Sequence, residues 1–454
     1  MIIDKDNCVC CGACIAICPR LEIKKNKPVI CKYDPTCSLC YKYCSKTYFP
    51  QNYFRDKLFG DAPYKDNSLG DFQDIIVACS TNKEILEKAQ NGGIVSTILY
   101  YLLEHKIVDG VLLTKKDKEW FPKPFIAKDP EEILDLGGSI YSVAPTLSVY
   151  REAVEELKLK KLCYVGMPCH MPAVRKIQLN PPLSKDYGII TIIIGLFCSA
   201  NYSYESLKSI CENKLNISIE DVSRFDVSKG NLITITKNNQ IKKIPIKETY
   251  KYHFSSCQYC KDYTAEFADL SIGSIGTLSD NLNSIIIRTK IAKSLIEELK
   301  KLKKIKIFNQ LDINKIKKAS NKKKFRIFPV NAGTEQILSL FLPMGEESQI
   351  FTAILSLGGA DLLTLHKVLE LPEDTVYKAL NNLKNKLWIY SDEKKYKAFN
   401  PALIFQREIT EMRDNVNKLK EIIKLNALPE LENLYFQNNI KDIKNNDDIY
   451  TYLL

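Results

Sequence analysis

A run of cysteines near the start of the chain constrains the fold more than any other feature of the sequence. Five cysteines fall within the eleven residues 8–18, and Pro19 closes the run. The whole chain has 16 cysteines among its 454 residues. Disulfide frameworks are typical of small secreted domains, and this chain is not small, so metal binding explains the cysteines better.

The spacing within the run predicts an iron–sulfur site. Four cysteines follow the pattern C-x2-C-x2-C-x3-C, namely Cys8, Cys11, Cys14 and Cys18, whereas Cys10 is not part of it. In bacterial ferredoxins three such cysteines hold one 4Fe-4S cluster, and in two-cluster versions the fourth holds the other. Zinc is the alternative, but zinc sites usually pair two C-x2-C motifs rather than use this triplet.

A second set of cysteines follows at Cys31, Cys37, Cys40 and Cys44. Its last three members repeat the x2, x3 spacing of the first set. Its first member lies three residues before the regular position, which Asp34 occupies, so either residue is a candidate ligand. If the two sets exchange their last members, Cys44 serves the first cluster and Cys18 serves the second.

Length, charge and hydropathy limit the class of protein. A chain of 454 residues predicts about two to four domains. The net charge of +11 counts every cysteine as neutral, whereas a 4Fe-4S cluster on four thiolates carries roughly −2, so this charge is weak evidence for a nucleic-acid partner. The chain opens without a secretory signal pattern, and its longest apolar run, 187–198, is too short to cross a bilayer. We therefore expect a cytoplasmic protein without membrane insertion.

Beyond Phe72 the chain alternates between apolar strand patterns and helical patterns, which predicts the fold class α/β. We expect strands at 75–79, 109–114, 161–166 and 187–198. We expect helices at 92–105, 130–138 and 147–160.

The ends of these elements carry residues suited to ligand binding. The Asn-Gly-Gly of 91–93 opens a helix, where free N–H groups favour a phosphate, although Asn-Gly also forms ordinary turns. The segment 165–170 ends a strand, where ligands of α/β sheets usually lie. Four further cysteines could hold a third cluster: Cys169, Cys198, Cys257 and Cys260. The alternative is that Cys169 and Cys198 are small buried residues.

Several segments together resemble the beta subunit family of coenzyme F-420 (F420) hydrogenases and dehydrogenases. They occur in the order of the family and cover about residues 70–320. The matching stretches are NGGIVSTILYYLLEHKIVDGVLL, PEEILDLGGSIYS, VGMPCHMPAVRK, IGLFCSANYSYESL, DVSKGNLI, CQYCKDYTAEFADLSIGSIGT and SIIIRT.

This resemblance implies an oxidoreductase that binds FAD, and it implies the residues that surround the flavin. Asn91, Gly92 and Gly93 would lie near the FAD phosphates. The flavin pocket would be lined by Ser139, Tyr141, Gly166, Met167 and Pro168. A third cluster near the flavin would be held by Cys169, Cys198, Cys257 and Cys260. We assign no side chain as general acid or base, because the flavin carries the chemistry.

Two residues depart from the family pattern. His170 stands where glutamine is common, and Tyr263 stands where phenylalanine is common. Neither change is disabling. His170 would either tune a neighbouring cofactor through a hydrogen bond or satisfy local polar groups.

The last third of the chain has a different composition. Lysines are dense at 298–308, where apolar spacing predicts a helix with a solvated face, and at 315–328, which we expect to be a basic linker. Residues 345–402 resemble a winged helix-turn-helix domain, closest to archaeal TrmB-like regulators. Its core would contain Leu357, Leu365, Val368, Leu369, Val376, Leu380 and Leu383.

The recognition helix of this domain would run over about residues 374–386. It would expose Tyr377, Lys378, Asn381, Lys384 and Lys386 for contacts with DNA, whereas Glu373 and Asp374 would oppose phosphate. The helix that follows carries an apolar stripe suited to dimerisation. The ENLYFQ segment at 432–437 matches a viral-protease tag site, which we interpret as coincidence.

Four parts are expected: a ferredoxin-type domain at 1–60, a FAD and iron–sulfur domain at 70–328, a winged helix at 335–402, and a helix with a polar tail at 403–454. The expected function is anaerobic electron exchange between a hydride carrier, such as reduced coenzyme F420, and ferredoxin or a partner redox subunit. Two alternatives stay open. One is a redox-sensing DNA-binding regulator, and the other is a ferredoxin-dependent reductase of an organic metabolite.

Overall fold

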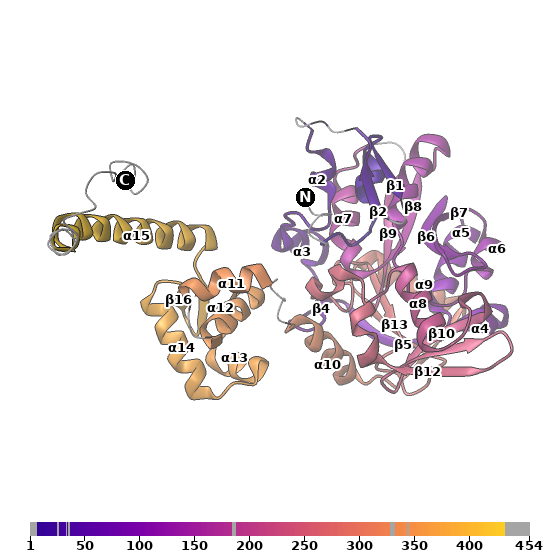
Figure 1. Ribbon diagram of the computed structural model, residues 1–454. Helices are drawn as coiled ribbons and strands as arrows, with labels where there is room; N and C mark the ends of the chain where they lie inside the picture. The colour runs from indigo at the N-terminus through magenta and orange to yellow at the C-terminus, as the bar shows by residue number, and fades with distance from the viewer. Residues whose placement is uncertain are drawn as a thin grey trace. The chain divides into compact units, whose positions relative to one another are not determined.

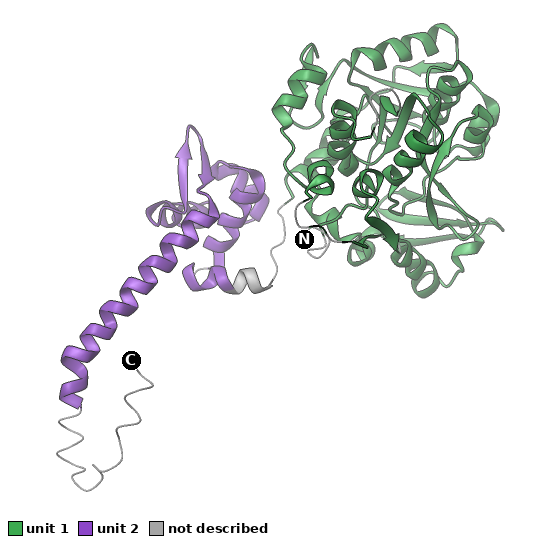
Figure 2. Cartoon of the chain, turned by 90° about the horizontal axis from the view of Figure 1, so that it is seen from above, with its two compact units in different colours: residues 1–326 green, residues 327–454 purple. Residues whose placement is uncertain are grey.

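The computed structural model describes residues 7–24, 27–32, 34, 37–183, 188–326, 332–342 and 345–431, with the backbone alone for 332–336. The chain forms two compact units, residues 1–326 and residues 327–454 (Figure 2). Within the described ranges, no helix is both long enough and apolar enough to cross a membrane.

An eight-stranded sheet forms the centre of the first unit, in the order β15-β5-β14-β13-β9-β8-β6-β7 (Figure 1). Its strands are β5 (Asp74–Ser80), β6 (Gly110–Lys116), β7 (Pro122–Ala127), β8 (Lys161–Gly166), β9 (Ile189–Leu196), β13 (Leu270–Gly273), β14 (Asn283–Ile287) and β15 (Ile305–Phe308). The central strands β6, β8, β9 and β13 are parallel neighbours, and the outer pairs are antiparallel. Most residues of β8 and β9 are buried, which explains their continuous apolar sequences. The expected α/β class is confirmed.

Two of the helices expected in this unit are confirmed. α5 (Ile94–Glu104) and α6 (Pro130–Leu134) form inside the expected ranges. The helix expected at 147–160 is confirmed over its first part, as a 3-10 turn, Thr146–Val149, followed by a π turn, Glu152–Glu156, whereas 157–160 are not helical. The N–H of Leu147 donates to the carbonyl of Cys11 (2.9 Å), so this segment is tied to the first cysteine loop.

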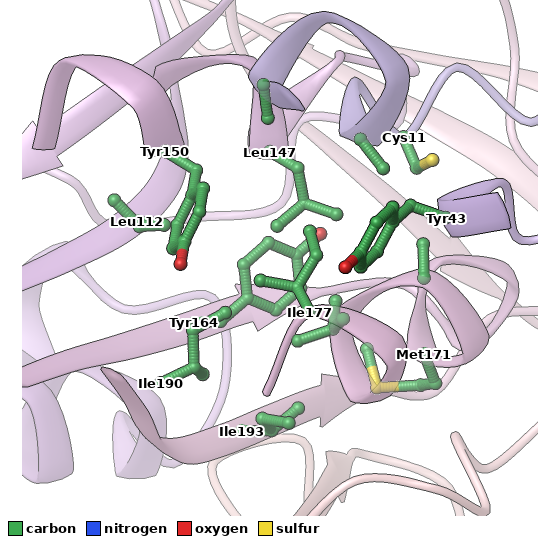
Figure 3. Packing of buried hydrophobic residues seen from close by; sticks show 14 of the residues in the cluster. Cys11, Tyr43, Leu112, Leu147, Tyr150, Tyr164, Met171, Ile177, Ile190 and Ile193 are labelled. Carbon is green, nitrogen blue, oxygen red and sulfur yellow. The ribbon is translucent and has the colours of Figure 1, made fainter. Parts of the chain in front are cut away.

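The cysteine-rich segment packs into the core of the first unit. It contains α1 (Ala13–Ile17), β1 (Leu21–Lys24), β2 (Lys27–Ile30), α2 (Leu39–Tyr43) and α3 (Gln51–Phe59). Cys11 and Tyr43 belong to one buried cluster with Leu147 and with Tyr164 of β8. Figure 3 shows the ring of Tyr164 in the middle of this cluster, with the side chain of Leu147 beside it.

Smaller elements complete the first unit. Two further sheets are formed by β3 (Tyr64–Asp66) with β4 (Gly70–Phe72), and by β10 (Val222–Ser228), β11 (Asn231–Thr236) and β12 (Ile241–Pro245). The remaining α-helices are α4 (Lys83–Lys88), α7 (Met171–Leu179), α8 (Tyr204–Lys214), α9 (Lys290–Lys301) and α10 (Ile313–Lys324). The remaining 3-10 turns are Pro168–His170, Ile219–Asp221, Ile246–Tyr252 and Ser255–Tyr259.

The two lysine-rich stretches differ from expectation. In the first, α9 ends at Lys301 and the strand β15 begins at Ile305, so only the first part of 298–308 is helical. In the second, the expected linker at 315–328 is wrong over its described residues, because α10 extends to Lys324. Ile316, Ser320 and Lys323 of α10 are buried, which shows that this helix packs into the unit.

The second unit contains α11 (Ala332–Phe341), α12 (Gly345–Leu357), α13 (Leu362–Leu369), α14 (Glu373–Asn385), the hairpin β16 (Ile389–Asp392) with β17 (Lys395–Ala398), and α15 (Pro401–Ile422), which continues as a π turn, Ile423–Ala427. Of the expected core residues, four are buried, namely Leu365, Val376, Leu380 and Leu383. Leu357 and Leu369 pack against them, and Val368 is half-buried. Trp388 is fully buried and was not among the expected core residues.

The expected recognition helix corresponds to α14 within one residue at each end. Tyr377, Lys378, Lys384 and Lys386 are exposed, and Asn381 is half-buried. The ENLYFQ segment at 432–437 and the polar tail after it lie outside the described residues.

Candidate functional site

Four cysteines from three distant segments line one cavity in the first unit, together with Met167, Pro168 and Lys323: Cys169, Cys198, Cys257 and Cys260. Cys169 follows β8 in the 3-10 turn Pro168–His170, and Cys198 follows β9 by two residues. The carboxyl ends of these parallel neighbours lie at the same edge of the sheet. The turn Ser255–Tyr259 and its C-cap residue bring the other two cysteines to the same place.

Burial and mutual repulsion make these thiols hard to ionise on their own. Burial raises the pKa of Cys169 well above its usual value, and the charges of Cys260, Cys198 and Cys257 raise it further. Burial also raises the pKa of Cys198 to about 12. Such a group of thiols becomes a set of thiolates when a positive centre binds them, because thiolates are the metal ligands.

Two features offset negative charge at this cavity. The N–H of Asn201 donates to the Sγ of Cys257 (3.4 Å). The ammonium of Lys323 donates to the carbonyl of Cys198 (2.7 Å). Burial lowers the pKa of Lys323, but the sulfurs of Cys260, Cys198 and Cys169, when ionised, outweigh that effect and raise it.

Four cysteine sulfurs that line one cavity are the donor set that a 4Fe-4S cluster uses. No three His, Cys, Asp or Glu side chains within the described part of the chain are arranged to hold one metal ion. A single zinc ion would draw its thiolates to about 3.8 Å from one another, as tetrahedral Zn–S bonds of about 2.3 Å require. A 4Fe-4S cube places iron and sulfide between the thiolates and holds them further apart. Four convergent, buried thiols fit such a cube.

The first N-terminal site brings together Cys8, Cys11, Cys14 and Cys44. Burial is the largest cause that raises the pKa of Cys14, followed by the charges of Cys11, Cys8 and Cys44. Backbone N–H groups point at two of these sulfurs, from Cys10 to Cys8 Sγ and from Lys46 to Cys44 Sγ, each at 3.4 Å. The charge of Cys44 acts on all three of Cys8, Cys11 and Cys14, whereas that of Cys18 is not among the main charges that act on them.

The second N-terminal site is less complete. Burial raises the pKa of Cys40, and the charges of Cys18 and Cys37 raise it further, so these three sulfurs lie near one another. Cys31 is exposed, and the charges acting on its thiol are those of Glu22 and Lys24 rather than of another cysteine. Asp34, the alternative ligand, forms an ion pair with Arg20.

Val9, Tyr164 and His170 lie between the first N-terminal site and the four-cysteine cavity. Val9 follows Cys8 and lines the cavity. The hydroxyl of Tyr164 contacts His170 Nδ1 (2.8 Å), and the charges of Cys11 and Cys169 both raise its pKa after burial. His170 is buried, and burial lowers its pKa to about 4, so the ring is neutral. Tyr164 is therefore near a cysteine of each of the two sites.

The residues expected around a flavin gather at two neighbouring places. Gln90 Oε1 accepts from the N–H of Ser139 (2.8 Å), and Gln90 Nε2 donates to Tyr141 OH (3.2 Å) and to Asp226 Oδ1 (3.3 Å). The next loop residues reach the cysteine cavity, because Val143 lines it. Asn201, which also lines the cavity, donates from Nδ2 to Met167 Sδ (2.9 Å).

Local packing accounts for the glycines at these positions. A Cβ on Gly92 would lie 2.9 Å from the backbone of Ala78 and Asn283, and Gly93 has a φ of +68°. A Cβ on Gly166 would lie 2.4 Å from the Tyr164 hydroxyl. Asn91 donates to the carbonyl of Asp280 (2.7 Å).

Sequence reasoning missed four residues here. Gln90 precedes the Asn-Gly-Gly motif and joins three loops, which only the fold reveals. Arg224 donates to the carbonyl of Gln90 (2.8 Å) and pairs with Asp226 (3.1 Å). Asp226 begins the DVSKGNLI stretch, so the resemblance itself was a signal for it. Lys323 was missed because it is one of many lysines in a lysine-rich stretch.

Comparison with known proteins identifies the two units. Two sequence-family models of the coenzyme F420 hydrogenase/dehydrogenase beta subunit match the chain. The model of the N-terminal part matches residues 75–151, and the model of the C-terminal part matches residues 159–313. The model of the sugar-specific transcriptional regulator TrmB matches residues 345–403, which confirms the expected winged-helix domain.

Comparison with individual proteins points to the same family. The chain is 39% identical to the coenzyme F420 hydrogenase subunit beta of Methanosarcina barkeri over 233 residues, which are 51% of this chain and 80% of that relative. It is 38% identical to the corresponding subunit of Methanococcus voltae over 232 residues, 51% of this chain and 82% of that relative.

A solved structure also points to this family. The F420-reducing NiFe hydrogenase complex from Methanosarcina barkeri, in a xenon derivative, contains a chain with a TM-score of 0.56 and 33% sequence identity. The match covers 61% of this chain and 96% of that chain. The chain therefore belongs to the coenzyme F420 hydrogenase/dehydrogenase beta subunit family and is an oxidoreductase.

Proposed function

We propose that this protein exchanges electrons between a hydride carrier, reduced coenzyme F420 or a similar one, and ferredoxin or a partner redox subunit. The observation that carries the proposal is the cavity in which four cysteines meet beside Met167 and Pro168. Its relatives support the choice of hydride carrier, since they are named as subunits of F420 hydrogenases.

FAD supplies a group that takes up a hydride and gives up electrons singly, and a 4Fe-4S cluster supplies a one-electron centre. In the proposed enzyme, Gln90, Ser139 and Tyr141 bind and orient the flavin, with Asn91, Gly92 and Gly93 on the phosphate side. The third cluster is held by Cys169, Cys198, Cys257 and Cys260. The first two clusters are held by Cys8, Cys11, Cys14 and Cys44, and by Cys18, Cys31, Cys37 and Cys40.

The surroundings of the cysteines support this assignment. In the first site and the cavity, Cys11 and Cys260 are buried and the other cysteines are partly buried, whereas Cys31 and Cys37 of the second site are exposed. An exposed site is the natural place for contact with an external electron carrier. The second site is therefore proposed as the one that faces ferredoxin or the partner subunit.

The test is anaerobic stopped-flow spectroscopy of the purified full chain. Mixing with reduced F420 should bleach the flavin absorbance within the dead time or shortly after it, and added ferredoxin should restore it. A flavin that is not bleached by reduced F420, NADH or reduced ferredoxin would contradict the proposal.

A second candidate function is DNA binding by the second unit, and the match to the TrmB regulator favours it. Tyr377, Lys378 and Lys384 are exposed on α14, but Glu373 and Asp374 occupy its first turn and oppose phosphate. A mobility-shift assay with DNA, on oxidised and on reduced protein, tests whether the second unit binds DNA. A sequence-preferring band that changes with redox state supports this function, and its absence in both states removes it.

A further inference from the structure

Lys323 lies deep in the four-cysteine site although it belongs to α10, beyond the residues that the beta-subunit family model matches. Lys323 is 4% exposed, and it lines the cavity with all four cysteines. Lysine is rarely buried to this degree unless an anion compensates its charge. The structure must therefore provide such an anion.

Carboxylates do not account for the burial of Lys323. Within the described ranges, no Asp or Glu oxygen forms an ion pair with Lys323 Nζ, whereas the next residue, Lys324, pairs with Glu266 (2.7 Å). Asp262 lies within electrostatic reach, but its buried Oδ1 has no hydrogen-bond partner among the described residues. The sulfurs of the cavity that Lys323 lines come before the carboxylate of Asp262 among the charges that act on its ammonium.

A hydrogen bond alone does not account for it either. Nζ donates to the carbonyl of Cys198 (2.7 Å), which uses one of three N–H donors of the ammonium. Lys176 makes the same contact with the carbonyl of Cys44 (2.7 Å) at the first cysteine site, where the lysine is half-buried. A lysine thus lies against a ligand-bearing loop at two sites, and the deeper one faces the cavity itself.

We propose that Lys323 is a positioning residue whose fixed positive charge stabilises the reduced state of the 4Fe-4S cluster held by Cys169, Cys198, Cys257 and Cys260. The inference rests on the proposed function. One-electron reduction changes the charge of the cluster and its thiolates from roughly −2 to roughly −3, and no bond is made or broken. A buried cation beside the cluster favours the more negative state, so it raises the reduction potential.

The experiment is an anaerobic redox titration with dithionite, followed by electron paramagnetic resonance of the full chain. The signal of the third site is identified as the one missing from Cys198→Ala. Lys323→Gln removes the charge and keeps an N–H donor for the Cys198 carbonyl. Lys323→Arg keeps the charge, and Lys322→Met removes an exposed lysine from the same helix as a matched control.

Lys323→Gln should make the third cluster at least tenfold harder to reduce, which corresponds to about 59 mV for one electron. Lys323→Arg and Lys322→Met should stay close to the wild type, and the other two clusters should not shift. Iron and sulfide per chain are measured in each variant, because a purely structural role would lower cluster content without moving the potential of the clusters that remain.

Three outcomes overturn the inference in distinguishable ways. An unchanged potential of the third cluster in Lys323→Gln overturns the role of Lys323 and leaves the proposed function intact. An equal shift in Lys322→Met assigns the effect to general surface charge. A wild-type protein that lacks the third cluster contradicts the proposed function, and this inference fails with it.

Discussion

Individual buried charges in the first unit serve either the cysteine sites or the sheet. Arg175 of α7 forms an ion pair with Asp269 (2.9 Å), and the two side chains are 1% and 4% exposed. Asp269 also accepts from the N–H of Ile193 in β9 (2.8 Å). This carboxylate therefore joins α7 to the strand that leads to Cys198.

Asp269→Ala should destabilise the protein by about 3–5 kcal/mol, because it leaves the guanidinium of Arg175 buried without its partner. The free energy of unfolding is measured by urea denaturation under anaerobic conditions. Asp61→Ala is the matched control, since Asp61 pairs with Lys290 at the surface, where such pairs contribute little. Equal destabilisation by the two substitutions would contradict the account.

His253 predicts a dependence of stability on pH. Burial lowers its pKa to about 4, and the nearby charges of Arg326 and Lys323 act in the same direction. Between its unfolded value of 6.5 and about 4, the unfolded chain binds a proton that the folded chain does not. The stability that His253 contributes is therefore complete above pH 6.5 and is lost as the pH falls through this window.

His253→Gln should flatten this part of the curve. The free energy of unfolding of the wild type and of the variant is compared at about pH 7.5 and at about pH 5. A smaller loss on acidification in the variant agrees with the account. An identical loss in both proteins shows that His253 titrates in the folded state as it does in the unfolded chain.

At the scale of elements, the first cysteine loop is shaped by the segment it packs on. Gly12 has a φ of +85°, and a Cβ there would lie 2.4 Å from the carbonyl of Pro145 and 2.6 Å from the N–H of Ser148. The turn Thr146–Val149 thus fits against a glycine that no larger residue can replace without movement of backbone.

Gly12→Ala should displace this loop and lower the iron content by roughly one cluster per chain. Gly230→Ala is the matched control, because Gly230 has a φ of +76° and no atom within 4 Å of an added Cβ. Both variants should lose roughly 1–2 kcal/mol from the left-handed backbone. Only Gly12→Ala should lose iron, and full iron content in it would contradict the proposed packing.

Sequence reasoning reached some elements and missed others for physical reasons. Buried parallel strands such as β8 and β9 have continuous apolar sequences, so they were predictable. The segment 147–160 has helical spacing, but its contact with the loop of Cys11 joins residues far apart in the chain. The basic stretch at 315–328 was misread because composition alone does not show that α10 packs into the core.

In the candidate site, too, some residues could be predicted from the sequence and others could not. The ferredoxin spacing at Cys8, Cys11 and Cys14 is local, so the sequence could predict it. Gln90 and Lys323 act only through contacts between distant segments. Residues of this kind are not marked by any local sequence pattern. The roles of all these residues remain predictions for experiment.

At the scale of the whole molecule, the long helix α15 predicts self-association. Five large apolar residues, four in α15 and one at the start of the π turn that continues it, follow one another at spacings of three and four and are each more than 40% exposed: Ile409, Met412, Val416, Leu419 and Ile423. This spacing is typical of the seam of a coiled coil. We propose a second copy of this chain as the occupant of the stripe, which would make the protein a homodimer.

Val416→Lys together with Leu419→Lys should convert the dimer to a monomer, since both changes place charge in the seam. Sedimentation equilibrium of the full chain measures the mass. Asn417→Lys adds charge beside the seam and serves as the control that should stay dimeric. A wild-type protein that sediments as a monomer at micromolar concentration would contradict this prediction.

The most direct test of the central claim is to count iron, acid-labile sulfide and flavin in anaerobically purified full-length protein, together with its absorbance spectrum. The account predicts about twelve iron and about twelve sulfide per chain, from three 4Fe-4S clusters, and about one flavin. Protein that contains zinc or no metal, and no flavin absorbance, would contradict it.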